Sequence, residues 1–111
     1  NNRGDEMVFQ LGSALLDACV LAVLSDGDTY GYVLTQKVRQ VIDVSESTLY
    51  PVLRRLQKDG SLTTYDVPFG GRNRRYYRIT EQGLLKYREY LAAWNEYKKS
   101  VDKVLGGKSD E

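Results

Sequence analysis

The stretch STLYPVLRRLQKDG, residues 47–60, predicts the helix around which the rest of the chain can be arranged. Its three leucines lie at positions i, i+4 and i+7, a spacing that places them on one face of a helix and the polar residues on the other. Gly60 is typical of the residue that follows a helix end. If the helix begins at Ser45 or Glu46, Pro51 lies in its second turn. Because proline has no N–H to donate, we expect a slight irregularity there but no break.

A hairpin is expected directly after this helix. SLTTYDVP, residues 61–68, is rich in threonine and aromatic residues, as strands are. RRYYRIT, residues 74–80, alternates so that Tyr77 and Ile79 lie on one face of a strand and two of the arginines on the other. The glycine pair in FGGRN, residues 69–73, predicts a long loop between the strands. Because an isolated two-stranded hairpin is not stable, it must pack against helices.

Two helices are expected before this region. VFQLGSALLDACVLAVL, residues 8–24, is apolar nearly all round, which is typical of a helix buried in a core or an interface. The second, residues 30–42, carries one apolar stripe, and Asp28 or Thr29 can cap it. The stripe consists of Leu34, Val38 and Val41.

A long helix is expected at the C-terminal end, over TEQGLLKYREYLAAWNEYKKSVDKVL, residues 80–105. Thr80 caps it, and its apolar residues alternate in spacings of three and four, a heptad seam interrupted by Lys98. About 25 residues at 1.5 Å each span roughly 38 Å, more than so small a domain needs. The extra length indicates a partner, most simply a second copy of the chain. The residues expected in this homodimer interface are Leu15, Cys19, Leu84, Tyr87, Leu91, Trp94, Val101 and Leu105.

Composition excludes several classes of protein. The 111-residue chain contains one cysteine and no histidine. One cysteine cannot form an internal disulfide, which favours a reduced, cytoplasmic setting. No apolar run approaches the roughly 20 residues that cross a bilayer. Without histidine, and without a nucleophile beside a base, we expect neither an enzyme nor a metal or cofactor site.

The charge of the chain is unevenly distributed. Nine basic and four acidic residues lie between Lys37 and Arg78, a net charge of +5, whereas the remainder of the chain carries −4. Such segregation is either chance clustering on a solvated surface or a basic face for a polyanion.

The order of three helices, hairpin and long helix predicts a mainly α (α+β) fold, a winged helix-turn-helix with a two-stranded wing and a long C-terminal dimerisation helix. Residues 1–79 would form the DNA-binding domain, with its first helix also in the dimer interface. Residues 80–105 would form the dimerisation helix and residues 106–111 a disordered tail. The third helix would enter the major groove of double-stranded DNA. The arginine-rich wing tip would neutralise phosphates or reach into the minor groove, and its glycines would let the backbone approach the duplex.

The same stretches resemble a known family. STLYPVLRRLQKDGSL, GGRNRRYYRIT and TEQG, together with DGDTYGYVL, are similar to the PadR family of bacterial transcriptional regulators over nearly the whole chain. The resemblance implies a transcriptional regulator, expected to be a repressor. The short last helix resembles that of a small PadR subclass that dimerises through its first and last helices. In some of those proteins a tryptophan of the last helix lines an effector pocket at the dimer axis, and the spacing from Thr80 to Trp94 matches that arrangement.

The DNA-binding candidates lie on the polar face of the third helix and on the wing. Tyr50 either contacts phosphate through its hydroxyl or covers the helix, and Ser47 and Thr48 either cap the first turn or read the groove. The basic residues are either solvated or in contact with DNA; on the helix, Arg54 is favoured for contact. Arg55 points sideways and is expected to pair with an acid. The candidates are Ser47, Thr48, Tyr50, Arg54, Lys58, Arg72, Asn73 and Arg74.

A small aromatic effector is a further expectation that follows from the resemblance. Trp94 either packs in the seam or lines a pocket, with Leu91 and Tyr90 as further candidates. Cys19 lies in an apolar helix and is expected to be inert, since reactive cysteines occupy exposed electropositive surroundings. A two-fold dimer predicts a palindromic operator. The alternative function is a winged helix used for protein contact, without specific DNA binding.

Overall fold

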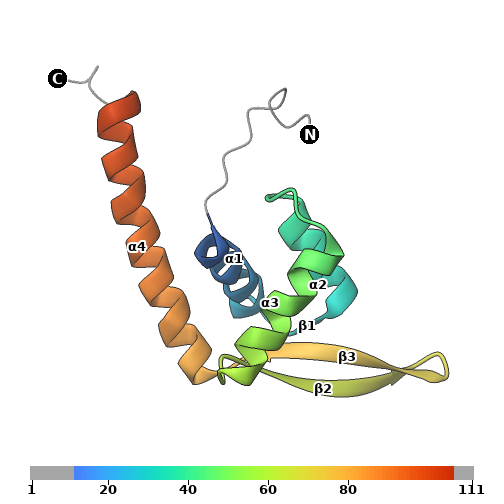
Figure 1. Ribbon diagram of the computed structural model, residues 1–111. Helices are drawn as coiled ribbons and strands as arrows, with labels where there is room; N and C mark the ends of the chain where they lie inside the picture. Colours follow the sequence, from blue (N-terminus) through green and yellow to red (C-terminus); the bar gives the residue numbers. More distant parts are fainter. Residues whose placement is uncertain (1–11, 107–111) are drawn as a thin grey trace.

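The computed structural model describes residues 12–106. Four helices and three strands follow one another in the order α1 (Ser13–Ser25), β1 (Thr29–Tyr30), α2 (Gly31–Arg39), α3 (Glu46–Lys58), β2 (Leu62–Phe69), β3 (Arg72–Ile79) and α4 (Glu81–Leu105). Helices α1, α2 and α3 lie together on one side of the β2–β3 hairpin, and α4 rises from the end of β3 beside them (Figure 1). The predicted winged helix-turn-helix is therefore confirmed. The first residues of the predicted first helix, 8–11, lie outside the described residues, as does the predicted tail, 106–111, apart from Gly106, which is the C-cap residue of α4.

The core lies between the three short helices and the inner face of the sheet. The leucine stripe of α3 is buried, as its i, i+4, i+7 spacing predicted, and Tyr77 of β3 closes the core from the sheet side. Helix α2 is shorter than predicted, because it ends at Arg39. Val41 therefore lies beyond the helix with 78% of its surface exposed, and its place in the predicted stripe was wrong. The largest fully buried hydrophobic side chains are Val20, Leu21, Leu24, Leu34, Val38, Leu49, Leu53, Leu56 and Leu62.

Both ends of α3 are formed by local hydrogen bonds. The Ser45 hydroxyl accepts a hydrogen bond from the backbone N–H of Thr48 at 3.2 Å, so Ser45 is the N-cap. At the other end the N–H of Ser61 donates to the carbonyl of Leu56 at 2.9 Å, the bond that closes a Schellman turn around Gly60. The predicted bounds of this helix are confirmed, with Pro51 inside it.

The sheet has one strand more than the sequence predicted. Its order is β1-β3-β2, all antiparallel, with Thr29 opposite Tyr77 and Tyr30 opposite Tyr76. The prediction that Asp28 or Thr29 caps α2 was wrong, because Thr29 lies in the strand and Tyr30 occupies the N-cap position. The short strand β1 thus joins the start of the helix-turn-helix to the wing.

The wing turn is tighter than predicted. Phe69 and Arg72 are paired directly, so the turn between them consists only of Gly70 and Gly71. These glycines have φ angles of 57° and 82°, the left-handed values that a two-residue hairpin turn requires. The predicted long loop was therefore wrong. Arg72 and Asn73 are the first residues of β3, and the turn itself accounts for the glycine pair.

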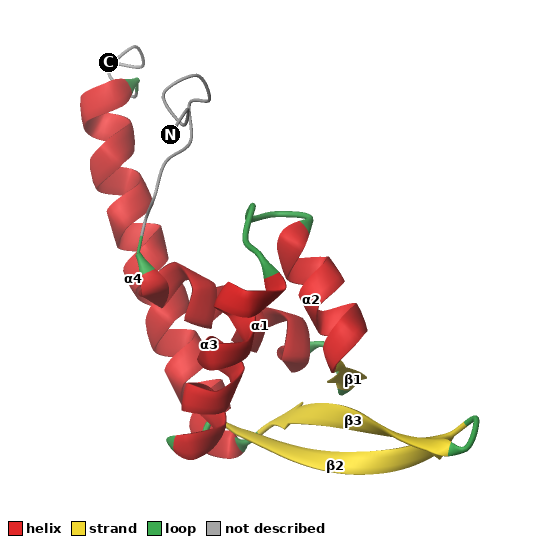
Figure 2. Cartoon of the chain, turned by 45° about the vertical axis from the view of Figure 1, so that its right-hand side comes forward, coloured by secondary structure: helices red, strands yellow, loops and turns green. Residues whose placement is uncertain are grey.

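Helix α4 begins on the core and then leaves it. The Thr80 hydroxyl accepts a hydrogen bond from the N–H of Gly83 at 3.0 Å and caps the helix as predicted. The first half of α4 packs beside α1, whereas its second half extends past the other helices (Figures 1 and 2). Between residues 12 and 106, none of the helices is both long and apolar enough to cross a membrane.

Candidate nucleic-acid interface

One face of α3 is polar, exposed and directed away from the core. Ser47, Tyr50, Arg54 and Lys58 are all exposed, and at 100° per residue they fall within about 80° of the helix circumference. Thr48 lies to the side of this group. Its hydroxyl is 3.0 Å from the Ser45 hydroxyl, in a capping cluster that also includes the Ser47 hydroxyl. The structure thus places the Thr48 hydroxyl beside the N-cap residue Ser45, and it groups the other four residues on one accessible face.

The wing candidates occupy different environments. Arg72 and Asn73 are exposed at the start of β3. Arg74 is half-buried, because its guanidinium carbon lies 3.7 Å from the ring centre of Phe69 and 4.0 Å from that of Tyr30. These are cation–π contacts across three strands. Arg74 therefore joins strand β1 to the wing tip, a role that the sequence did not indicate.

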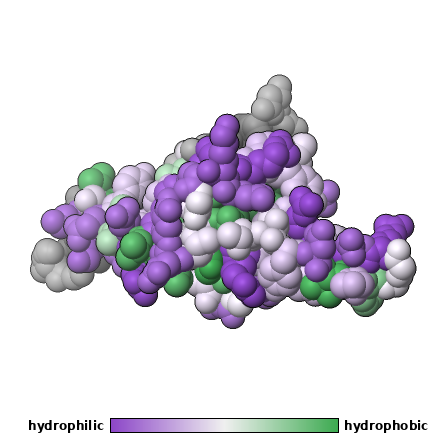
Figure 3. All heavy atoms as spheres, turned by 90° about the horizontal axis from the view of Figure 1, so that it is seen from below, coloured by the Kyte–Doolittle hydropathy of each residue, from purple (hydrophilic) through white to green (hydrophobic). Residues whose placement is uncertain are grey.

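The outer face of the sheet carries a row of three aromatic rings, of which Tyr65 and Tyr76 are stacked and Tyr30 is tilted against Tyr76. The Tyr76 ring centre lies 5.6 Å from that of Tyr30 and 5.5 Å from that of Tyr65. The Tyr65 hydroxyl donates to Asp28 at 2.7 Å, and Arg78 forms an ion pair with the same carboxylate at 3.1 Å. The view from below shows purple, hydrophilic side chains interspersed with paler and green ones along the underside of the molecule (Figure 3). The contacts of Tyr76 with Tyr30 and the bonds to Asp28 connect the wing to the segment that precedes α2.

Ion pairing separates the arginines into two groups. Arg55, Arg75 and Arg78 each pair with an aspartate, at 2.7, 3.6 and 3.1 Å. Within residues 12–106, no ion pair involves the remaining cations of α3 and the wing, which are Arg54, Lys58, Arg72 and Arg74. On α3 and the wing, four positive charges are therefore not neutralised by an ion pair within the described part of the fold.

A second feature is an apolar pocket between α1 and α4. Its volume is about 340 Å³. Two of the effector candidates, Trp94 and Tyr90, line it, whereas Leu91 lies outside the lining. Trp94 is 37% exposed, and its ring lies 6.0 Å from the ring of Tyr97, centre to centre. The lining residues are Ala14, Leu15, Ala18, Tyr90, Ala93, Trp94 and Tyr97.

Cys19, which follows the pocket residue Ala18 on α1, is half-buried and packs against the core. Burial raises the pKa of its thiol above the ordinary value. A raised pKa lowers the fraction of thiolate, which is the reactive form.

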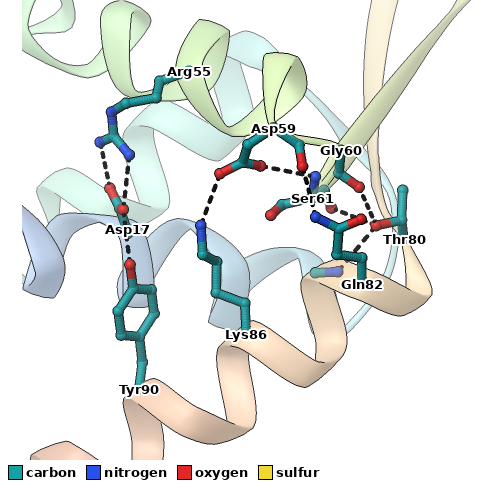
Figure 4. A network of polar contacts seen from close by, with 10 residues as sticks. Asp17, Arg55, Asp59, Gly60, Ser61, Thr80, Gln82, Lys86 and Tyr90 are labelled. Carbon is teal, nitrogen blue, oxygen red and sulfur yellow. Dashed lines mark hydrogen bonds and ion pairs between the residues drawn. The ribbon is translucent and has the colours of Figure 1, made fainter.

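A polar network connects α3 to α1 and α4 (Figure 4). Arg55 donates to both oxygens of Asp17, at 3.0 and 2.7 Å, which confirms that this arginine pairs with an acid. The hydrogen bonds to Asp17 raise the pKa of Arg55. Tyr90 donates to the same carboxylate at 3.1 Å, and Lys86 of α4 donates to Asp59 at 2.7 Å. Sequence reasoning missed Asp17, although one acid in an otherwise apolar helix was the available signal.

The model of the transcriptional regulator PadR-like family matches residues 20–89, from the middle of α1 through the hairpin into α4. The chain belongs to the PadR-like family. PadR regulators are regulatory DNA-binding proteins and not enzymes, and they typically form dimers.

Relatives of known sequence and structure are similar over most of their length. The transcriptional regulator Rv3488 of Mycobacterium tuberculosis is 38% identical, over 81% of this chain and 82% of its own. The structure of smu.1704 from Streptococcus mutans is 34% identical with a TM-score of 0.83, covering 92% of this chain and 96% of that one. A PadR-like transcriptional regulator from Bacillus cereus is 31% identical with a TM-score of 0.77, covering 86% and 96%.

Proposed function

We propose that the protein is a homodimeric, sequence-specific repressor that binds a palindromic DNA operator and is released by a planar aromatic effector. One observation supports DNA binding above all: unpaired positive charge lies on a polar, exposed surface. The exposed face of α3 is polar, and cations on this face and on the hairpin have no ion-pair partner in residues 12–106. In this arrangement Tyr50 and Arg54 contact base edges and phosphates in the major groove, while Arg72 and Asn73 contact phosphates beside it.

The homodimer is supported by apolar surface on α4. Leu91 is 43% exposed and Leu105 73% exposed, and the apolar side chains of Trp94, Tyr97 and Val104 are also exposed on this helix. Exposed apolar side chains in a heptad pattern are typical of a helix that pairs with another helix. Leu15 of α1 lines the same side of the molecule beside α4, so two copies can bury both helices together.

The effector site is the pocket between α1 and α4. Trp94 and Tyr97 supply aromatic walls, and three alanines leave room beside them. Flat apolar walls suit a planar aromatic ligand held by stacking. Dimerisation through α1 and α4 would bring two such pockets close to the two-fold axis. A ligand there alters DNA affinity only if it binds the two dimer geometries unequally.

Selection of bound duplexes from random DNA tests the proposal. Recovery of a palindrome, bound with an affinity that falls steeply with salt, supports a dimeric DNA-binding regulator. Recovery of unrelated duplexes with no salt dependence would instead favour a winged helix used for protein contact. Repression is tested by placing the recovered palindrome in a promoter that drives a reporter.

The effector is tested by titrating planar aromatic compounds while following the fluorescence of Trp94, the only tryptophan of the chain. Saturable quenching that also releases the selected duplex supports the effector site. Quenching with no effect on DNA binding contradicts it.

A further inference from the structure

Tyr90 takes part both in the α1–α4 pocket and in the polar network around Asp17. Its ring lines the pocket between α1 and α4, and its hydroxyl donates a hydrogen bond to Asp17 Oδ2 at 3.1 Å. Burial, with the nearby Asp17 carboxylate, raises the pKa of Tyr90, so the hydroxyl keeps its proton and remains a donor at neutral pH. A change at the pocket wall therefore reaches Asp17 directly.

Asp17 in turn is hydrogen-bonded to α3, the helix that carries the proposed DNA-binding face. The residue is only 3% exposed, and its two oxygens accept a bidentate pair of hydrogen bonds from Arg55 of α3. A buried carboxylate requires such partners, and the planar guanidinium fixes both distance and orientation. Arg55 neighbours Arg54, which points outward on the DNA-facing side. Because the two residues are adjacent on one helix, a rotation of Arg55 about the helix axis also moves Arg54.

A second contact fixes the end of the same helix. Lys86 of α4 donates to Asp59 Oδ2 at 2.7 Å, and Gln82 donates to the Asp59 carbonyl at 2.6 Å. Arg55 and Asp59 are four residues apart on α3, and Lys86 and Tyr90 are four apart on α4. Residues at i and i+4 lie on the same side of a helix, so the contacts form two adjacent links between the helices, as Figure 4 shows. Asp17 of α1 completes the link on the Tyr90 side.

We propose that Tyr90 is a positioning residue for DNA binding: through Asp17 and Arg55 it sets the orientation of α3, and it transmits occupancy of the α1–α4 pocket to that helix. This inference rests on the proposed function of the pocket and the DNA-binding face. Base contacts require an accurately placed helix, whereas phosphate contacts tolerate small displacements. Loss of the Tyr90 hydroxyl therefore lowers specificity more than it lowers general affinity for DNA.

The test compares Tyr90→Phe with Tyr97→Phe. Both variants keep an aromatic ring in the pocket wall, but only Tyr90 loses a hydroxyl that is hydrogen-bonded within residues 12–106. In the absence of any ligand, hydrogen exchange of the α3 amides should increase about fivefold in Tyr90→Phe and stay at the wild-type rate in Tyr97→Phe. The ratio of affinities for the selected duplex and a scrambled one should fall about fivefold in Tyr90→Phe only.

A ligand arm uses 1-anilinonaphthalene-8-sulfonate, whose binding is followed by energy transfer from Trp94. Its binding should change the exchange of the α3 amides in the wild type and leave them unaltered in Tyr90→Phe. The proposal would be overturned if the α3 amides of ligand-free Tyr90→Phe exchanged at the wild-type rate and the ratio of affinities for the selected and scrambled duplexes were unaltered. Binding of the probe to the wild-type pocket with no change in α3 would also overturn it. If DNA selection yields no preferred duplex, or the probe does not bind, the proposed function fails instead, and exchange in the ligand-free variants still decides the role of Tyr90.

Discussion

Gly83, in the first turn of α4, lies directly against the backbone carbonyl of Ser61. A β-carbon at this position would overlap that carbonyl oxygen and would also come within 2.8 Å of Ile79 Cγ1. The close approach lets the Thr80 cap, the end of α3 and the start of α4 meet, because Thr80 also donates to the carbonyls of Gly60 and Ser61. The glycine of the TEQG motif is thus explained by packing.

Gly83→Ala should destabilise the fold by about 1–3 kcal/mol, because the backbone on either side must move apart. Alanine is intrinsically the better helix former by about 1 kcal/mol, so the sign of the change identifies the steric effect. The measurement is urea unfolding. Gly31→Ala is the matched control, since its new β-carbon would meet only Tyr77 Cε1, at 3.7 Å, and this variant should be unchanged or slightly more stable. Equal effects at the two glycines would contradict the explanation.

Arg72→Ala should lower the slope of log K against log salt by about 0.9, the value for one lost phosphate contact, on selected and random duplexes alike. Arg72 is exposed on the wing and has no ion-pair partner within the described residues, so its charge is available to DNA. Lys99→Ala, on the far half of α4, serves as the control and should leave the slope as it is. A loss of affinity at constant slope would show that Arg72 does not contact phosphate.

Arg74→Lys should loosen the wing while keeping its charge. A lysine cannot place a planar guanidinium over both Phe69 and Tyr30, and a cation–π contact at an exposed site contributes about 0.5–1 kcal/mol. Hydrogen exchange of the β2 and β3 amides near the turn should therefore become about threefold faster. Arg72→Lys, a substitution two residues away and outside these contacts, should not change the exchange. If the two variants behave alike, the stack does not stabilise the wing.

The ion pair between Asp59 and Lys86 should make stability depend on pH in acid. Burial raises the pKa of Asp59, but hydrogen bonds from Lys86 and Ser61 outweigh it, so the pKa lies below the ordinary value. A carboxyl with a lowered pKa stabilises the fold above its unfolded pKa of about 3.9, and this contribution is lost as the pH falls through the folded pKa. In Asp59→Asn the free energy of unfolding should decline less steeply below about pH 4.

Urea unfolding over a series of acidic pH values measures this dependence. Glu96→Gln is the control, because Glu96 is exposed and its contact with Lys99 is 3.7 Å long. An Asp59→Asn variant that loses stability in acid as steeply as the wild type would show that the pair contributes nothing to acid stability.

Leu91→Asp should dissociate the proposed homodimer. The wild type should show about twice the chain mass of 12.6 kDa by light scattering at micromolar concentration, and the variant should shift toward the single mass and bind the operator more weakly. Leu85→Asp is the matched control, because Leu85 is 56% exposed on the same helix but outside the heptad seam. A monomeric wild type would contradict the dimer itself.

The sequence by itself determined the elements whose causes are local. The leucine spacing of α3, the Ser45 and Thr80 caps and the alternation of β3 each depend on residues a few positions apart, and the structure has all of them. The positions of the DNA-binding candidates on one helix face and one hairpin follow from the same periodicities.

Only the tertiary structure decided what depends on residues far apart in the chain. Strand β1 exists because Thr29 and Tyr30 meet β3, about 47 residues later, and Arg74 is stacked because β1 lies there. Asp17 is separated by 38 residues from Arg55 and by 73 from Tyr90. No local pattern encodes these pairings. They form because folding a buried carboxylate or an aromatic face without a partner would cost more free energy than bringing these distant segments together.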